Sequence, residues 1–149
     1  MATVTARPGR ALGVDLGSRR IGLALSDPAR VVASPHDVLT RSGDPEADRR
    51  AIVAAARAAG ATTIVVGLPL SLSGRAGPAA RAALAEVEAL RVAGAPDVDV
   101  VAHDERLTTV TAERALSEGR VRRETRRRVV DKVAAAVMLQ AWLERSPAR

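Results

Sequence analysis

The sequence contains no cysteine, phenylalanine or tyrosine, and Trp142 is its only aromatic residue. Without cysteine, the chain can form neither a disulfide bond nor a thiolate metal site. A single aromatic side chain also argues against a nucleic-acid surface built on base stacking. Because hydrophobic residues still make up 47% of the chain, the core must be built from Ala, Val, Leu and Ile.

Long apolar runs are absent as well. No stretch of 18 consecutive apolar residues occurs, and the N-terminus lacks the apolar segment of a signal peptide. We therefore expect a soluble, cytoplasmic protein. A length of 149 residues predicts one domain, which we place at 10–145 after a flexible tail at 1–9.

Lysine is nearly absent, since Lys132 is the only one among 23 basic residues. The net charge of +6 is divided unevenly: residues 1–30 carry +3, residues 31–118 carry −3 and residues 119–149 carry +6. Guanidinium groups suit phosphate oxygens, so a polyanionic partner is plausible. A GC-rich coding bias would explain many of these arginines. It does not explain the cluster of Arg120, Arg122, Arg123, Arg126, Arg127 and Arg128.

The chain opens with two short apolar runs joined by a Gly-Ser-Arg-Arg turn, which predicts a β-hairpin over 11–27. Gly22 interrupts the second run and indicates that another backbone approaches there. A third strand is expected at 31–39, at a sheet edge because it contains Pro35.

Further along, strands and helices alternate. Asp44 and Pro45 predict the start of a helix that ends near Ala59. The other expected elements are a strand at 62–66, a loop at 67–77, a helix at 79–92, a strand at 97–102, a short helix ending at 118 and a final helix at 127–145. The predicted fold class is α/β, with a mixed five-stranded sheet of three antiparallel and then parallel strands, and helices on both faces. The basic stretch 119–128 is expected to be a mobile loop between the last two helices.

Three acidic positions could meet in this topology: Asp15 in the first strand, Asp104-Glu105 after the last strand, and Asp131 on the final helix. A carboxylate in an apolar strand is costly unless a metal or another cation neutralises it. Alternatively, Asp15 caps the amides of the following turn. Asp131 heads an apolar helix face, and the alternative there is that it stabilises the helix N-terminus.

Converging carboxylates without a thiolate or histidine pair select a hard divalent ion, Mg²⁺ or Mn²⁺. Two such ions can activate a water molecule and stabilise the leaving oxygen of a phosphodiester. His36 and His103 each stand alone and are poor metal ligands. His103 could assist a proton transfer, although an ordinary strand-end residue is the simpler interpretation.

Four motifs resemble those of the YqgF family of ribonuclease-H-like nucleases, relatives of the Holliday-junction resolvase RuvC. They occur in order across residues 11–143: GxDxGxxRIGxAxSD at 13–27, GLPL at 67–70, DERLTT at 104–109 and DxxAAxxxLQxWL at 131–143. The resemblance implies a ribonuclease-H-like fold with Asp15, Glu105 and Asp131 as catalytic metal ligands. It also implies 5′-end maturation of the small-subunit ribosomal RNA precursor (pre-16S rRNA).

One departure concerns the second acid, which such enzymes generally place at the end of the fourth strand. Here that position holds Gly67-Leu68-Pro69, so the acid must be Asp104 or Glu105, and the motif favours Glu105. Nucleic-acid binding is predicted for nine basic and hydroxyl-bearing residues: Arg19, Arg20, Arg106, Thr108, Thr109, Arg122, Arg123, Arg126 and Lys132.

Several functions remain open from the sequence. The first is a metal-dependent endonuclease on pre-rRNA, and the second is the same chemistry on branched DNA, which would favour a twofold homodimer over a monomer. A third is a non-catalytic RNA-binding factor in ribosome assembly. An actin-like ATPase is a fourth, but such enzymes need two domains of this kind.

Overall fold

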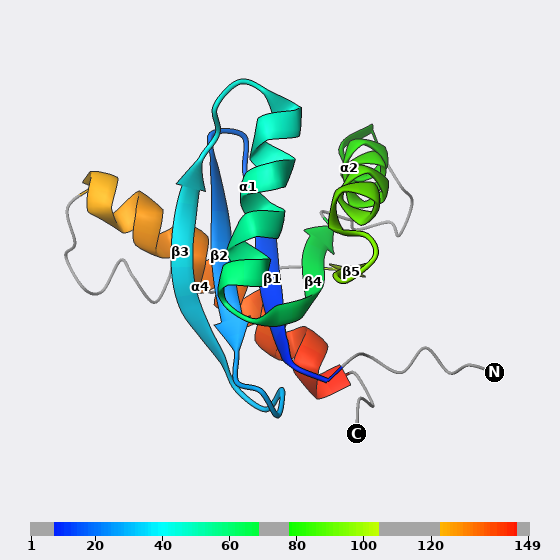
Figure 1. Cartoon of the computed structure of the whole chain (residues 1–149). Coiled ribbons are helices and arrows are strands. Elements are labelled where there is room, and N and C mark those ends of the chain that lie inside the picture. The colour runs from blue at the N-terminus through cyan, green and yellow to red at the C-terminus, as the bar shows by residue number, and fades with distance from the viewer. Residues whose placement is uncertain (1–7, 69–77, 105–122, 146–149) are drawn as a thin grey trace.

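A computed structural model of the chain describes residues 8–68, 78–104 and 123–145, with the backbone alone at 79, 80, 104 and 123–126 (Figure 1). Its elements are β1 (Arg10–Leu16), β2 (Arg20–Ser26), β3 (Ala33–Thr40), α1 (Pro45–Ala58), β4 (Ala61–Leu68), α2 (Pro78–Gly94), β5 (Asp99–Asp104) and α4 (Arg123–Arg145). The predicted loop at 69–77 and the predicted helix ending at 118 lie outside the described residues. No helix in the described part is long and apolar enough to span a membrane.

The five strands form one mixed sheet in the order β3-β2-β1-β4-β5. Strands β1, β2 and β3 pair antiparallel, whereas β4 is parallel to β1 and β5 is parallel to β4. The predicted hairpin, the edge position of β3 and the mixed sheet are therefore confirmed. Because β1 and β4 are parallel neighbours, their carboxyl ends lie at the same edge of the sheet.

Helices cover both faces of this sheet, as predicted (Figure 1). On one face, α1 and α2 contribute Ile52, Val53, Val87 and Leu90 to a core with large aliphatic residues of β1, β2 and β4. On the other face, α4 is the helix that the described residues provide. Its buried residues include Ala135, Met138 and Leu139, and they meet small sheet residues such as Ala11 and Ala24.

Local sequence signals explain where α1 begins. The Asp44 carboxylate accepts a hydrogen bond from the Glu46 amide at 3.1 Å, and Pro45 occupies the first turn. A capped helix start with proline at the first position is favourable, because proline has no amide hydrogen to leave unpaired there. The helix ends one residue before the expected Ala59, and Gly60 follows with a φ of 76°.

The last helix departs from the prediction at its start. It begins at Arg123, about one turn before the expected position 127. The expectation of a mobile loop over 119–128 is therefore wrong for 123–128, which are helical, while 119–122 lie outside the described residues. Arginine has a high helix propensity, so an arginine-rich run continues a helix readily when nothing breaks it.

The C-terminal half of α4 is attached to the chain between β2 and β3 by one amide side chain. Gln140 accepts a hydrogen bond from the Ala33 amide at 2.8 Å and donates to the Val31 carbonyl at 3.0 Å. The same connection is held by Asp27, whose carboxylate accepts from the Val31 and Val32 amides at 2.7 and 2.8 Å. These hydrogen bonds favour the ionised form and lower the pKa of Asp27 below 3.8.

This lowered pKa predicts a pH-dependent contribution to stability. A carboxyl group whose pKa is lower in the folded state stabilises that state fully above its unfolded pKa of about 3.9, and the contribution disappears as the pH falls through the folded pKa. Asp27→Asn should therefore lower the Tm at neutral pH, and the difference from wild type should shrink below about pH 4. Thermal unfolding followed by circular dichroism across this range measures it. A difference independent of pH would contradict the prediction.

Candidate active site

The candidate site lies where β1 ends, on the face of the sheet that α4 covers. Asp15 is paired with Gly22 across the β1–β2 hairpin, and residues paired in this way project to the same face of a sheet. A Cβ atom added at Gly22 would lie 2.0 Å from the backbone oxygen of Asp131. The face shared by Asp15 and Gly22 is therefore the one against α4, and the Asp131 backbone lies on that face over the residue paired with Asp15.

A second glycine supports this assignment. Gly13 lies two residues before Asp15 in β1, on the same face because side chains alternate along a strand. A Cβ atom at Gly13 would be 2.9 Å from Cβ of Leu139 and 3.2 Å from the Ala135 carbonyl oxygen, both in α4. The sequence prediction that a backbone approaches Gly22 closely is thus confirmed, and the approaching backbone is that of α4.

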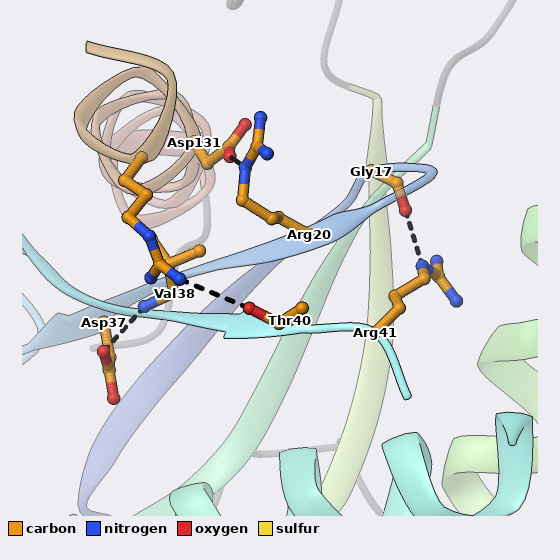
Figure 2. A network of polar contacts seen from close by, with 8 residues as sticks. Gly17, Arg20, Asp37, Val38, Thr40, Arg41 and Asp131 are labelled. Carbon is orange, nitrogen blue, oxygen red and sulfur yellow. Dashed lines mark hydrogen bonds and ion pairs between the residues drawn. The ribbon is translucent and has the colours of Figure 1, made fainter. Parts of the chain in front are cut away.

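Asp131 forms an ion pair with Arg20 (Figure 2). The Nε atom of Arg20 donates to Oδ2 of Asp131 at 2.6 Å, and the two side chains are 24% and 25% exposed. Arg20 is the first residue of β2 and lies on the same face as Gly22, two positions further on. It is thereby a diagonal cross-strand neighbour of Asp15. The ion pair was not predicted, because the sequence indicated only a phosphate-binding role for Arg20.

Because α4 starts earlier than predicted, Asp131 is not at the N-terminus of this helix. This residue lies more than two turns after Arg123, whereas the helix dipole favours anions only within about the first turn. Stabilisation of the helix N-terminus therefore does not account for it. The predicted apolar face below Asp131 is confirmed, because Ala135 and Met138 are completely buried and Trp142 packs against the same cluster.

The structure bears on the alternative role of Asp15, in which its side chain caps the amides of the turn. Asp15 belongs to β1, which extends to Leu16, and the Gly17 amide donates instead to the Arg20 carbonyl oxygen at 3.0 Å. That backbone hydrogen bond closes the hairpin without the Asp15 side chain. Asp15 is half-buried, so its charge is neither fully solvated nor fully enclosed.

Strands β4 and β5 extend the same row of residues. Val14 in β1 is paired with Val66 in β4, so the next residue of each strand places Asp15 beside Gly67. Gly67 is in turn paired with His103 in β5. Asp15 is thus flanked by Gly22 in β2 and Gly67 in β4, and the Asp131 backbone occupies the space above Gly22. His103 lies on the Asp15 face, in step with Val101, which packs against the α4 cluster. Side chains alternate between the two faces along a strand. Counting two residues on from the apolar Val101 would therefore have placed His103 on this face from the sequence.

A basic rim, defined here as Arg20, Arg41 and Arg128, lies at this end of the sheet. Figure 2 shows Arg20 and Arg41 there. Arg41 follows β3 and donates to the Gly17 carbonyl oxygen at 2.6 Å, and Arg128 of α4 donates to Thr40 Oγ1 at 3.3 Å. Neither residue was among the predicted nucleic-acid contacts. Arg41 comes close to the site only through strand pairing, which positions β3 beside β2.

The remaining predicted site residues are placed only in part. Arg19 is exposed in the hairpin turn, and Lys132 follows Asp131 in α4, whereas Arg123 and Arg126 are located as positions on α4 alone. Those outside the described residues are Glu105, Arg106, Thr108, Thr109 and Arg122. Asp104 ends β5 level with Leu68.

The donor chemistry of the site suits a hard divalent cation. Asp15 and Asp131 supply carboxylate oxygens, the ligands that Mg²⁺ and Mn²⁺ prefer. Within the described ranges no group of three or more metal-ligating side chains occurs. Glu105, the predicted third acid, lies outside those ranges.

Comparison with known proteins agrees with the sequence motifs. A family model described as "RuvX: Holliday junction resolvase" matches residues 9–145. A protein of Kineococcus radiotolerans named "Putative pre-16S rRNA nuclease" is 51% identical over 138 residues, which cover 93% of this chain and 73% of that protein. A protein of the same name from a Roseiflexus species is 40% identical, with coverage of 95% of this chain and 98% of its own length.

Among solved structures, RuvC of T. thermophilus in complex with a Holliday junction substrate superposes with a TM-score of 0.52. The two chains are 18% identical, and the superposition covers 94% of this chain and 97% of that one. This likeness concerns the fold, and it confirms the predicted ribonuclease-H-like α/β class.

The close contact at Gly22 predicts a sensitive position. Gly22→Ala would place a methyl group 2.0 Å from the Asp131 backbone oxygen, so α4 must shift away from the sheet. Overpacking of this kind costs about 1–3 kcal/mol or more, and we expect the upper end because a helix backbone cannot yield as a side chain does. Urea denaturation measures the loss.

Gly94→Ala is the matched control. The nearest atom to a Cβ there is a side-chain carbon of Val98 at 3.3 Å, so its effect should be much smaller. Equal stability of Gly22→Ala and wild type would show that α4 does not approach β2 as described.

Proposed function

The chain belongs to the RuvX family of nucleases, and on this premise we propose that it is a metal-dependent endonuclease that processes the 5′ end of pre-16S rRNA. The membership confirms the resemblance to the YqgF family that the motifs indicated. The observation that carries the proposal is the meeting of Asp15 and Asp131 on one face of the sheet, although they lie on elements at opposite ends of the sequence. The names of its relatives support pre-rRNA as the substrate.

Asp15 and Asp131, together with Glu105, would hold Mg²⁺ or Mn²⁺, with two ions expected. When bound, such ions lower the pKa of a water molecule and stabilise charge on the leaving oxygen of a phosphodiester. The contribution of the protein is to keep the carboxylates converged. The register of β1 with β2 fixes Asp15, and the contact of α4 with Gly22 fixes Asp131.

The surrounding cations would bind the polymer. The basic rim lies beside the carboxylates, so backbone phosphates held there extend past the reacting bond. Arg19, exposed in the adjacent turn, and Lys132, next to Asp131, add positive charge at the same edge. The predicted contacts from Arg106, Thr108, Thr109, Arg122, Arg123 and Arg126 belong to this proposal as well.

A second candidate is cleavage of branched DNA, which the description of the matching family model favours. The same carboxylates would perform the same hydrolysis, and a homodimer would be needed to cut two strands symmetrically. The two substrates differ in the 2′-hydroxyl and in groove shape, and proteins distinguish RNA from DNA by these features. A direct comparison of substrates therefore separates the candidates.

The decisive experiment compares wild type with Asp15→Asn in Mg²⁺ or Mn²⁺, on a pre-16S rRNA 5′-end fragment and on a four-way DNA junction. The substitution removes one ligand charge and keeps the side-chain size. Changes to residues that merely support metal ligands cost about 10–100-fold, so we expect at least a 100-fold lower cleavage rate for this variant. Wild type should cleave the RNA, and EDTA should abolish cleavage.

Asp37→Asn is the matched control, because Asp37 is an exposed carboxylate of β3 paired with Leu23, whose side chain belongs to the opposite core. Its cleavage rate should equal that of wild type. Cleavage of the junction alone would favour the resolvase. If no substrate is cleaved and both wild type and Asp15→Asn bind the RNA tightly, the protein is a non-catalytic assembly factor.

A further inference from the structure

The ion pair between Arg20 and Asp131 places a cation at the point where the site carboxylates converge. The Nε–Oδ2 distance is 2.6 Å, both side chains are about three-quarters buried, and Arg20 is also the diagonal neighbour of Asp15. A partly buried carboxylate is costly unless a cation lies nearby. Arg20 supplies that positive charge to Asp131 from within the chain.

A divalent ion bound by the same carboxylates would make this arrangement unfavourable. The guanidinium and the ion carry charges of the same sign, and their repulsion at a partly buried site is screened less than at the surface. The ion also takes over the role of neutralising Asp131. The pairing of Arg20 with Asp131 and the binding of a metal to Asp131 are therefore expected to compete.

The backbone contact at Gly22 shows that Asp131 does not depend on Arg20 for its position. The Asp131 carbonyl lies directly over Gly22, and the helix residues that follow are buried against the sheet. If the Arg20 side chain were removed, the Asp131 backbone would stay in place. The Asp131 backbone is thus held without Arg20, so the carboxylate can exchange the guanidinium for a metal ion while the helix stays in place.

We propose that Arg20 is the internal counter-ion of the metal site: it neutralises Asp131 in the metal-free protein, and a divalent ion displaces it. The inference rests on the proposed metal-dependent function. The released guanidinium lies at the start of β2, level with Thr40, which accepts a hydrogen bond from Arg128 and precedes Arg41. It is then free, within the basic rim, to bind a phosphate of the nucleic acid, because arginine is well suited to phosphate oxygens.

The consequence is a thermodynamic coupling between two ligands. If metal binding frees a phosphate-binding arginine, the metal must tighten nucleic-acid binding, and nucleic acid must tighten metal binding by the same factor. The protein would then assemble its metal site most readily when a substrate is present.

The first test is Mn²⁺ binding to the full-length protein, measured by isothermal titration calorimetry without nucleic acid. Removing the competing cation in Arg20→Ala and Arg20→Gln should tighten Mn²⁺ binding about tenfold, which corresponds to about 1.4 kcal/mol. Arg19→Ala is the matched control, since it removes an exposed arginine from the same turn, and its affinity should stay within about twofold of wild type. Thermal unfolding confirms that each variant is folded.

The outcomes separate this inference from the proposed function. Unchanged or weaker Mn²⁺ binding by both folded Arg20 variants overturns the counter-ion role and leaves the proposed function standing. Equal tightening in Arg19→Ala overturns it too, because general charge rather than the specific pair would then be responsible. If wild type binds no Mn²⁺, both the inference and the proposed metal dependence fail.

The second test measures the coupling by fluorescence anisotropy of a labelled single-stranded RNA, in EDTA and in Ca²⁺ at matched ionic strength. Wild type and Arg19→Ala should both gain affinity when the divalent ion is added, by about tenfold if the coupling is about 1.4 kcal/mol. Arg20→Ala should lose most of this gain. The same gain in all three proteins would overturn the coupling.

Discussion

The site depends on one steric constraint, the close approach of α4 to the sheet over Gly13 and Gly22. A side chain at either position would collide with the helix: with Leu139 and Ala135 over Gly13, and with the Asp131 backbone over Gly22. Asp131 stands beside Asp15 because this contact fixes both the height and the position of the helix. The sheet is covered differently on its other face, where larger aliphatic side chains pack against two helices. Small residues are thus concentrated where the geometry of the site requires a short distance.

The distribution of charge adds a second constraint. Half-buried carboxylates are stable beside one another only with a counter-charge, and the chain supplies arginine from β2 for this purpose. Further arginines reach the same edge from the end of β3 and from α4. Carboxylates surrounded by arginines suit a nucleic-acid substrate: the carboxylates would hold metal ions at the reacting phosphate, and the arginines would bind the neighbouring phosphates. Arg20 of the N-terminal segment and Arg128 of the C-terminal segment both lie beside Thr40, because α4 packs over β2.

The relation to known proteins agrees with this physical description at two levels. Family membership rests on matches over nearly the whole chain, and the superposition with RuvC shows the fold at much lower identity. The names of the relatives favour RNA and the description of the family model favours DNA, so the comparisons together do not choose the substrate. That choice depends on groove shape and on contacts with the 2′-hydroxyl, which carboxylate geometry does not encode.

The sequence by itself determined the elements and their order. Alternation and β-branched runs marked the strands, Asp44-Pro45 marked the start of α1, and the motifs identified Asp15 and Asp131 and the approach at Gly22. These signals succeed because they are local: side-chain period, caps and turns act within a few residues. Only the tertiary structure decided that Arg20 pairs with Asp131 and that Arg41 and Arg128 reach the same edge. Each depends on strand register or on helix–sheet packing, which bring together residues far apart in the chain and which no local pattern specifies.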